Sequence, residues 1–201
     1  MFFKKKTFST DNLESVITAC IDNNSQAQRT LIGLFMGYSK SICSRYSSNE
    51  QEVEEIINDG FLKIFTNLSK YDSSQPFKAW LRTIMVNTAI DFYRSNKKYH
   101  LNIAIDDIEI PDFDDDVISQ LSAAEIMGLV QKLSPTYRMV FMLCVVEGYK
   151  HKEIAAKLGI QEGTSKSNLQ DARLKLQEMI RLYYPHLFAI YSVKKNKINE
   201  N

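Results

Sequence analysis

The chain has 201 residues, enough for one sizeable domain or two small ones, and its 44% hydrophobic and 24% charged residues are ordinary for a soluble globular protein. It holds only seven glycines and four prolines, and its apolar residues recur mainly every three or four positions, which predicts an all-α protein. No run approaches the roughly 18 consecutive apolar residues of a transmembrane helix, and no apolar stretch follows the basic N-terminus, so we expect neither membrane insertion nor secretion.

The three cysteines, Cys20, Cys43 and Cys144, are widely spaced and lie in apolar helical runs. Buried reduced thiols in a cytoplasmic protein are therefore expected. No histidine shares a metal-ligand spacing with them, so we expect no metal and no cofactor. The sequence also lacks a glycine-rich phosphate loop, a nucleophile elbow and a paired base and nucleophile, which predicts a protein that is not an enzyme.

The first block of the chain reads as four helices, over residues 11–21, 25–46, 50–68 and 76–98. The third helix has an apolar core stripe and, on its other side, an acidic patch. The acidic patch consists of Glu54, Glu55, Asn58 and Asp59.

The fourth helix is predicted to be apolar on two sides, with a polar stripe between them. The stripe consists of Trp80, Asn87, Asp91, Arg94 and Lys98. Hydrogen-bonding side chains, an aromatic ring and cations together suit an unwound nucleic-acid strand. The alternative is a solvated helix face with an Asp91–Arg94 ion pair, and the stripe alone leaves both possibilities open.

Residues 99–121 interrupt the helical pattern, since they carry seven acidic residues, no lysine or arginine, and Pro111. Clustered aspartates such as Asp114–Asp116 can bind divalent cations, but no supporting ligand set accompanies them. An extended acidic linker is the better interpretation. The predicted domains are residues 10–98 and 117–183, with the linker at 99–116 and a C-terminal tail at 184–201.

The second block resumes with helices expected over residues 116–132 and 134–148. Ser134 suits the cap of the latter helix, and Pro135 suits its first position. The residues expected in its core are Val140, Phe141, Leu143, Cys144 and Val145.

Residues 151–180 then predict two helices that meet at a tight corner. The first, at about 151–158, buries Ile154, Ala155 and Leu158, and Gly159 suits the left-handed conformation that often follows a helix end. The buried positions expected in the second helix are Ser165, Leu169, Ala172, Leu176 and Ile180. Its opposite face offers Lys166, Ser167, Gln170 and Asp171. This arrangement fits a helix-turn-helix whose second helix enters the DNA major groove, while an ordinary helical hairpin is the alternative.

Two segments resemble the sigma-70 superfamily, specifically its extracytoplasmic-function (ECF) type. The first segment of this chain resembles region 2 of the family. It reads VEEIINDGFLKIFTNLSKYDSSQPFKAWLRTIMVNTAIDFYRSNKK, with an acidic pair, a Phe-Leu-Lys run, Ala-Trp-Leu and Asn…Asp…Arg. The second segment resembles region 4 and reads LSPTYRMVFMLCVVEGYKHKEIAAKLGIQEGTSKSNLQDARLKL, with Leu-Ser-Pro, Glu-Ile-Ala and Gly-Thr-x-Lys-Ser. With the helices before each segment, the resemblance covers roughly residues 10–182, and it implies two helical domains joined by a linker without a region 3 domain.

The resemblance implies a sigma factor that binds core RNA polymerase and promoter DNA, and an anti-sigma factor is a candidate further partner. In the family, region 2 binds the polymerase clamp helices and holds the unwound −10 strand. Polymerase binding would then involve Glu54, Glu55, Asn58 and Asp59. Contacts to the −10 element would involve Trp80, Asn87, Asp91, Arg94 and Lys98. The acidic linker would occupy a nucleic-acid channel of polymerase.

Region 4 of the family reads the duplex −35 element and docks on the polymerase flap. The residues that the resemblance places in the groove are Lys166, Ser167, Gln170 and Asp171, and Asn168 is a further candidate for a base contact, to adenine. Thr164 and Arg173 would contact phosphates and set the register. The chain departs from the family at three positions, since Asn168 and Asp171 stand where arginines are frequent and Ser165 replaces the usual valine. Fewer cations predict weaker phosphate attraction.

Two other functions compete with this prediction. A stand-alone helix-turn-helix regulator would bind duplex operator DNA without polymerase, usually as a two-fold dimer. A metal-dependent nuclease would use Asp114–Asp116, but the further ligands that such a site needs are missing.

Overall fold

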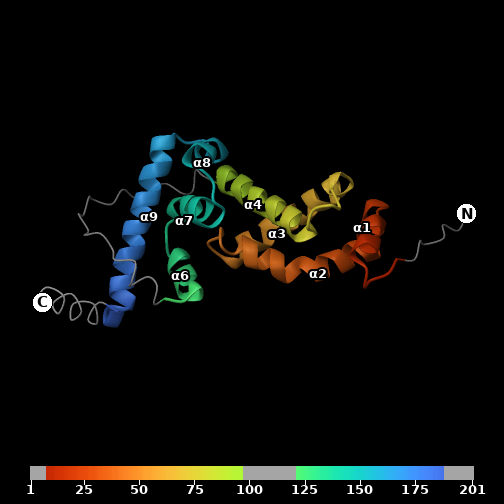
Figure 1. Cartoon of the computed structure of the whole chain (residues 1–201), viewed down its shortest axis with the longest axis horizontal. Coiled ribbons are helices and arrows are strands. Elements are labelled where there is room, and N and C mark those ends of the chain that lie inside the picture. Colours follow the sequence, from red (N-terminus) through yellow and green to blue (C-terminus); the bar gives the residue numbers. More distant parts are fainter. Residues whose placement is uncertain (1–7, 97–120, 188–201) are drawn as a thin grey trace, which may run out of the picture. The chain divides into compact units, whose positions relative to one another are not determined.

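A computed structural model of the chain describes residues 8–96 and 121–187, whose regular elements are all helices (Figure 1). The chain divides into two compact units, with the division after Ser95. The predicted linker, Asp114–Asp116, Lys98 and the end of the predicted tail lie outside the described residues. The predicted domain boundaries therefore stay predictions.

Within residues 8–95, the first unit has four α-helices and one short 3₁₀ turn. They are α1 (Leu13–Ile21), α2 (Ser25–Cys43), α3 (Glu50–Asn67), η1 (Leu68–Lys70) and α4 (Phe77–Ser95). Asparagines explain where three of them begin, because the side-chain oxygens of Asn12, Asn24 and Asn49 accept backbone N–H groups of the first turns of α1, α2 and α3. The four helices expected from the sequence are present, with α2 and α4 ending about three residues early.

The core of the first unit depends on a close approach of α3 and α4. Gly60 of α3 is buried, and a Cβ atom placed there would collide with the sulfur of Met85 on α4. A larger residue at this position would therefore require the Met85 side chain to move. The thiols of Cys20 and Cys43 are also buried here, and burial raises their pKa values to about 11 and about 12.

Within residues 121–187, the second unit has four α-helices and one π-helical turn. They are α6 (Ala123–Val130), α7 (Pro135–Phe141), η3 (Met142–Val146), α8 (His151–Leu158) and α9 (Glu162–Tyr183). Ser122 and Glu125 form a capping box at the start of α6, while Ser134 caps α7 and Pro135 is its first residue, as the sequence predicts.

The π-helical turn corrects the predicted core of residues 134–148. Val140 and Leu143 are buried as expected, but Phe141 and Cys144 are only partly buried and Val145 is 51% exposed. The backbone N–H of Glu147 bonds the carbonyl of Met142, five residues back. This wider turn rotates the side chains that follow it, so Val145 leaves the face that a regular α-helix would bury.

None of the described helices is both long enough and apolar enough to cross a membrane. Within residues 8–96 and 121–187, no three His, Cys, Asp or Glu side chains gather as a metal site would require.

Candidate nucleic-acid and polymerase-binding surfaces

The corner between α8 and α9 has the geometry of a helix-turn-helix. Gly159 follows α8 with φ 62° and ψ 44°, the left-handed conformation expected of it. The expected buried residues of α8 are buried, and so are all five expected in α9. The predicted helical pair is confirmed, and its core face matches the pattern read from the sequence.

A polar contact holds the two helices of this motif together near their N-terminal ends. The Nδ1 atom of His151, the first residue of α8, lies 2.9 Å from the Oγ atom of Ser165 on α9. Ser165 is 0% exposed, so its hydroxyl needs a partner inside the protein. His151 supplies that partner, which explains how the core tolerates the hydroxyl of a serine at this position.

Most of the side chains predicted to contact DNA are exposed on α9. They are Thr164, Lys166, Ser167, Gln170 and Arg173. The hydroxyl of Ser167 donates a hydrogen bond to the carbonyl of Thr164 at 3.2 Å, and the ammonium of Lys166 lies 2.8 Å from the carboxylate of Glu162. These five residues share one face, the face opposite the buried stripe.

Asn168 is the exception, because it is only 6% exposed and its side chain belongs to the core. It lies three residues after Ser165 and four before Ala172, both buried, so its helical spacing already placed it on the inner face. This burial argues against the predicted contact of Asn168 with DNA.

Asp171 is half-buried at the edge of the same face. Its carboxylate accepts a hydrogen bond from the hydroxyl of Tyr137 on α7. Burial, followed by this carboxylate, raises the pKa of Tyr137 above its ordinary value. Asp171 thus helps to attach the recognition helix α9 to α7, which leaves it less free to reach a base.

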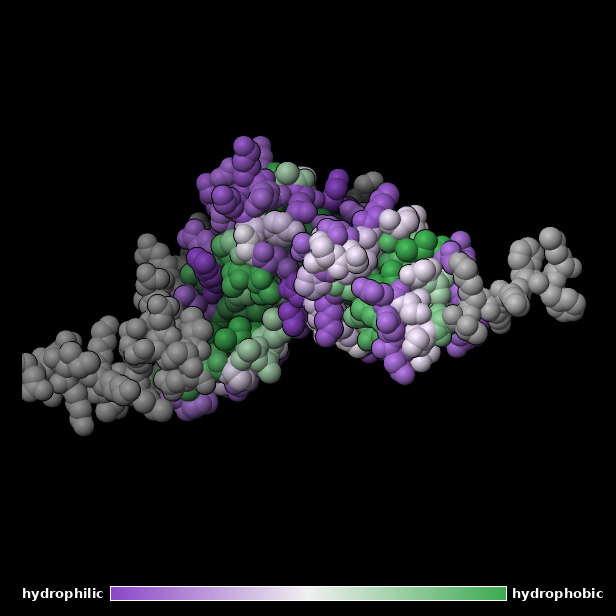
Figure 2. All heavy atoms as spheres, turned by 45° about the vertical axis from the view of Figure 1, so that its right-hand side comes forward, coloured by the Kyte–Doolittle hydropathy of each residue, from purple (hydrophilic) through white to green (hydrophobic). Residues whose placement is uncertain are grey.

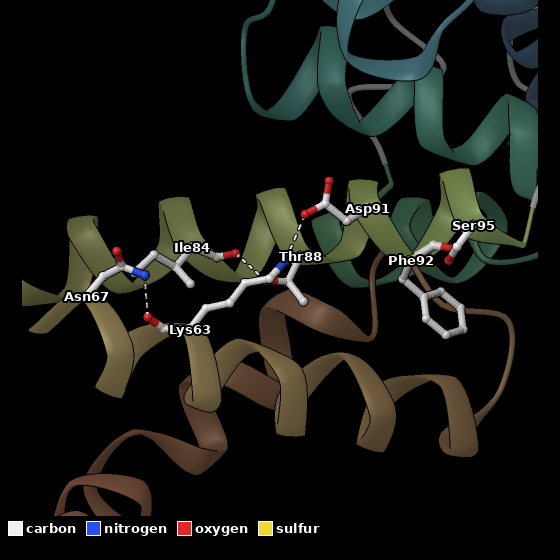
Figure 3. Close-up of polar contacts among 7 residues, drawn as sticks. All are labelled: Lys63, Asn67, Ile84, Thr88, Asp91, Phe92 and Ser95. Carbon is white, nitrogen blue, oxygen red and sulfur yellow. Dashed lines mark hydrogen bonds and ion pairs between the residues drawn. The ribbon is translucent and has the colours of Figure 1, made fainter. Parts of the chain in front are cut away.

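The polar stripe of α4 is partly engaged within the first unit (Figure 3). The ammonium of Lys63 on α3 lies 2.7 Å from the carboxylate of Asp91, which replaces the Asp91–Arg94 pair considered from the sequence. Asn87 is half-buried and Arg94 is exposed. Sequence reasoning missed Lys63, because its partner lies 28 residues away on another helix.

Trp80 stands at the start of the same stripe, in a cluster of aromatic rings. Its ring centroid lies 5.3 Å from that of Tyr71 and 5.6 Å from that of Phe77. Trp80 and Tyr71 are half-buried, while Phe77 is buried. The ring of Trp80 is therefore both a packing element and an accessible aromatic surface.

All four residues of the acidic patch on α3 are exposed. Leu62, on the same side of the helix, is 66% exposed. Figure 2 shows, for one face of the molecule, that hydrophobic residues lie at the surface among hydrophilic ones. Single exposed hydrophobic residues are common, so Leu62 supports a candidate protein-binding surface only together with the acidic patch beside it. Helical spacing could have identified this residue, since Leu62 follows Asn58 by four positions and so lies on the acidic side of the helix.

These features define an all-α protein with a helix-turn-helix in one unit and a mixed aromatic and polar stripe in the other. Comparison with known families agrees: the sigma-70 region 2 model matches residues 31–99 and the sigma-70 region 4 model matches residues 123–176, together more than half of the chain.

Two curated relatives and one solved structure illustrate the similarity. The ECF RNA polymerase sigma factor SigL of Mycobacterium tuberculosis is 30% identical over 142 residues, which are 67% of this chain and 80% of SigL. SigE of Mycolicibacterium smegmatis, another ECF sigma factor, is 25% identical over 141 residues, or 68% of this chain, but the match spans only 54% of SigE. The sigma factor RpoE of Bartonella quintana, solved with the anti-sigma factor NepR, is 22% identical, with 76% of this chain and 96% of that chain covered and a TM-score of 0.44.

The chain belongs to the sigma-70 family of RNA polymerase sigma factors, and within it to the ECF type. It is a sigma factor that directs promoter-specific initiation of transcription, with core RNA polymerase and promoter DNA as partners. The alternative of a stand-alone helix-turn-helix regulator is not favoured.

Proposed function

We propose that this sigma factor contacts a promoter at two elements: α4 binds the melted −10 strand, and α9 binds in the major groove of the −35 duplex. The observation that carries this proposal is the exposed face of α9, opposite a fully buried core stripe. The residues assigned to the −35 contact are Thr164, Lys166, Ser167, Gln170 and Arg173. Asn168 is withdrawn, and Asp171 keeps only a peripheral role because of its bond to Tyr137.

The chemistry of these five side chains suits DNA. Gln170 can pair with the edge of adenine, and Lys166 can donate either to guanine or to a nearby phosphate. Thr164 and Arg173 lie at either end of the exposed face, where phosphate contacts would fix the register of the helix. With two cations among the five, the phosphate attraction of this face is modest, so we expect it to depend on polymerase for stable binding.

For the −10 strand, the proposed contacts are Trp80, Asn87 and Arg94, with Lys98 beyond the described residues. The accessible part of the Trp80 ring offers a stacking surface for an unpaired base, and Arg94 offers charge for the backbone. Asp91 is assigned a positioning role through Lys63 rather than a direct contact.

For polymerase, the proposed docking surface joins the acidic patch to Leu62 on one side of α3. Exposed carboxylates favour a basic partner surface and speed association, while an exposed leucine supplies apolar area at the centre of contact. Nucleotide chemistry stays in polymerase, so this chain is proposed to act without catalysis and in the cytoplasm. An anti-sigma factor, such as the one that accompanies the Bartonella relative, would be a competing ligand of this chain.

A transcription assay tests the function as a whole. Core polymerase supplied with this chain should initiate at discrete positions on genomic DNA, and sequencing the transcripts would give both promoter elements. Failure to bind core polymerase, or to direct any initiation with it, would refute the proposal.

Substitution of Leu62 by Gln tests the docking surface. Since Leu62 is 66% exposed, the change should leave folding intact and weaken binding to core polymerase by about tenfold, a typical effect at the centre of an interface. Thr66→Ala is the matched control, because Thr66 is exposed one turn further along α3. Equal affinities for Leu62→Gln and the unaltered protein would remove Leu62 from the surface.

A further inference from the structure

Opposite charges gather where α8 and α9 begin, on the side of the helix-turn-helix that faces DNA in the proposed function. Glu162 is the first residue of α9, and its carboxylate lies 2.8 Å from the ammonium of Lys166, one turn along. His151 and Lys152, at the start of α8, also act on this carboxylate. One negative charge thus lies among three basic side chains from two helices.

The carboxylate is ionised at neutral pH. The pKa of Glu162 is lowered below its ordinary value. The largest causes are the hydrogen bond and the charge interaction with Lys166, and the charges of His151 and Lys152 contribute less. Glu162 also sits at the N-terminal end of a 22-residue helix, where the backbone N–H groups favour a negative charge.

A DNA phosphate has the same requirements as this carboxylate. Both are anions with oxygen acceptors, and both are favoured by charged donors and by the N-terminal end of a helix. When a recognition helix lies in the major groove, its N-terminal residues and the preceding helix come close to the sugar-phosphate backbone. Glu162 and a phosphate would therefore compete for one set of donors.

We propose, on the basis of the promoter-binding function above, that the Glu162 carboxylate occupies the place of a DNA phosphate in the free protein and must release Lys166 before duplex DNA binds. Glu162 acts as an internal competitor. It lowers the affinity of the free sigma factor for any duplex, specific or not, because Lys166 is paired and a nearby phosphate is repelled.

This competition adds to the effect of the small number of cations on the exposed face of α9. A recognition face with few cations, one of them already paired, binds duplex weakly when the protein is alone. Attachment to polymerase raises the effective concentration of the promoter, and that gain offsets the competition. The free protein then avoids nonspecific DNA, whereas the polymerase-bound protein still reads its promoter.

Glu162→Gln in the full-length chain tests the proposal. Fluorescence anisotropy with a short duplex of arbitrary sequence, measured over a series of salt concentrations, should show binding several-fold tighter than that of the unaltered protein. The dependence of log affinity on log salt should steepen by up to about 0.9, the value for one additional phosphate contact.

Glu178→Gln is the matched control. Glu178 also pairs with a lysine of α9, since its carboxylate lies 2.6 Å from the ammonium of Lys175, and the substitution changes the net charge by the same amount. It lies four turns from the helix start, so duplex affinity should stay close to that of the unaltered protein. If both variants tighten binding equally, net charge alone is responsible and the proposal is overturned.

A cycle with Lys166→Gln isolates the pair itself. In that background, Glu162→Gln should gain much less affinity, and an undiminished gain would overturn the role of Lys166. Glu162→Ser is the second neutral variant, because serine is well tolerated at a helix start, and thermal unfolding checks that either variant folds. If both neutral variants fold and bind duplex no tighter than the unaltered protein, the proposal is refuted.

Promoter-directed transcription with core polymerase separates this proposal from the function on which it rests. If the unaltered protein initiates transcription but Glu162→Gln leaves duplex affinity unchanged, only the competition fails. If the unaltered protein directs no initiation, the proposed promoter-binding function is rejected, and so is the competition by Glu162 that rests on it.

Discussion

The ammonium group of Lys63 on α3 lies 2.7 Å from a carboxylate oxygen of Asp91 on α4, and this ion pair joins the two proposed binding surfaces of the first unit (Figure 3). The α3 helix carries the acidic patch, and α4 carries the stripe proposed for the −10 strand. Both side chains are about half-exposed, so the pair contributes only ~0.2–1 kcal/mol to stability. Its larger effect is geometric, since it fixes the side chain of Asp91 toward α3.

Substitutions of these two residues should therefore act as one unit. Asp91→Asn and Lys63→Gln should each weaken open-complex formation to a similar, small extent, and the double substitution should cost no more than either alone. Permanganate footprinting of the melted strand would measure the effect. If Asp91 instead contacts DNA directly, Asp91→Asn will be the more damaging change, and the two effects will add.

Substitutions of Asn168 and Gln170 should have different effects, the first on stability and the second on DNA binding. Asn168→Ala removes a buried polar side chain and should lower the free energy of unfolding by about 1 kcal/mol, a typical value for a disturbed core position. Gln170→Ala should leave stability unchanged and reduce discrimination at one base pair of the −35 element by ~1–3 kcal/mol.

Chemical denaturation of each variant would measure its stability. Binding to a panel of −35 duplexes, in the presence of core polymerase, would measure its base discrimination. A loss of base discrimination in Asn168→Ala without a loss of stability would restore Asn168 to the DNA-reading face.

The cysteines should differ in reactivity. Because burial raises the pKa of Cys20 to about 11 and that of Cys43 to about 12, both thiols stay protonated at neutral pH and react slowly with iodoacetamide. Cys144 is only partly buried. Mass spectrometry should find at most one alkylated cysteine in the native protein, at Cys144, and three after unfolding. Native labelling of Cys43 would contradict the packing of the first unit.

Stability at high pH should depend on Tyr137. Its pKa is raised in the folded protein, mainly by burial and then by the Asp171 carboxylate, so the folded state holds this proton more tightly than the unfolded chain does. The resulting stabilisation is complete below the unfolded value of about 10 and is lost as the pH rises through the higher folded value.

Comparison with Tyr137→Phe measures that contribution. Phenylalanine has no proton to lose, so the stability difference between the unaltered protein and the variant should shift in favour of the variant above a pH of about 10. Urea unfolding at several pH values would give the difference. A constant difference across this range would show that Tyr137 titrates alike in both states.

The order of helices and most of the core could be predicted from the sequence, because those features depend on local rules. Helix starts followed from Ser134 and Pro135, the corner from Gly159, and the buried face of α9 from residues spaced at three and four. The exposure of the acidic patch followed in the same way, and the family was evident from two motifs in one order.

The π-helical turn could not be predicted, since a regular helical period was assumed through Val145 and one widened turn moves every later side chain. The burial of Asn168 was missed for a different reason: a polar residue was taken to be exposed, although its spacing from Ser165 and Ala172 put it inside.

The fold class, the helix-turn-helix and the membership of the sigma-70 family could thus be inferred from the sequence alone, because periodicity and motifs are properties of neighbouring residues. Which polar side chains remain available for a partner depends instead on how the helices pack. Asp91 is held by Lys63, Asp171 by Tyr137, and Ser165 by His151. Each pair joins different helices, so its members meet only once the helices have packed.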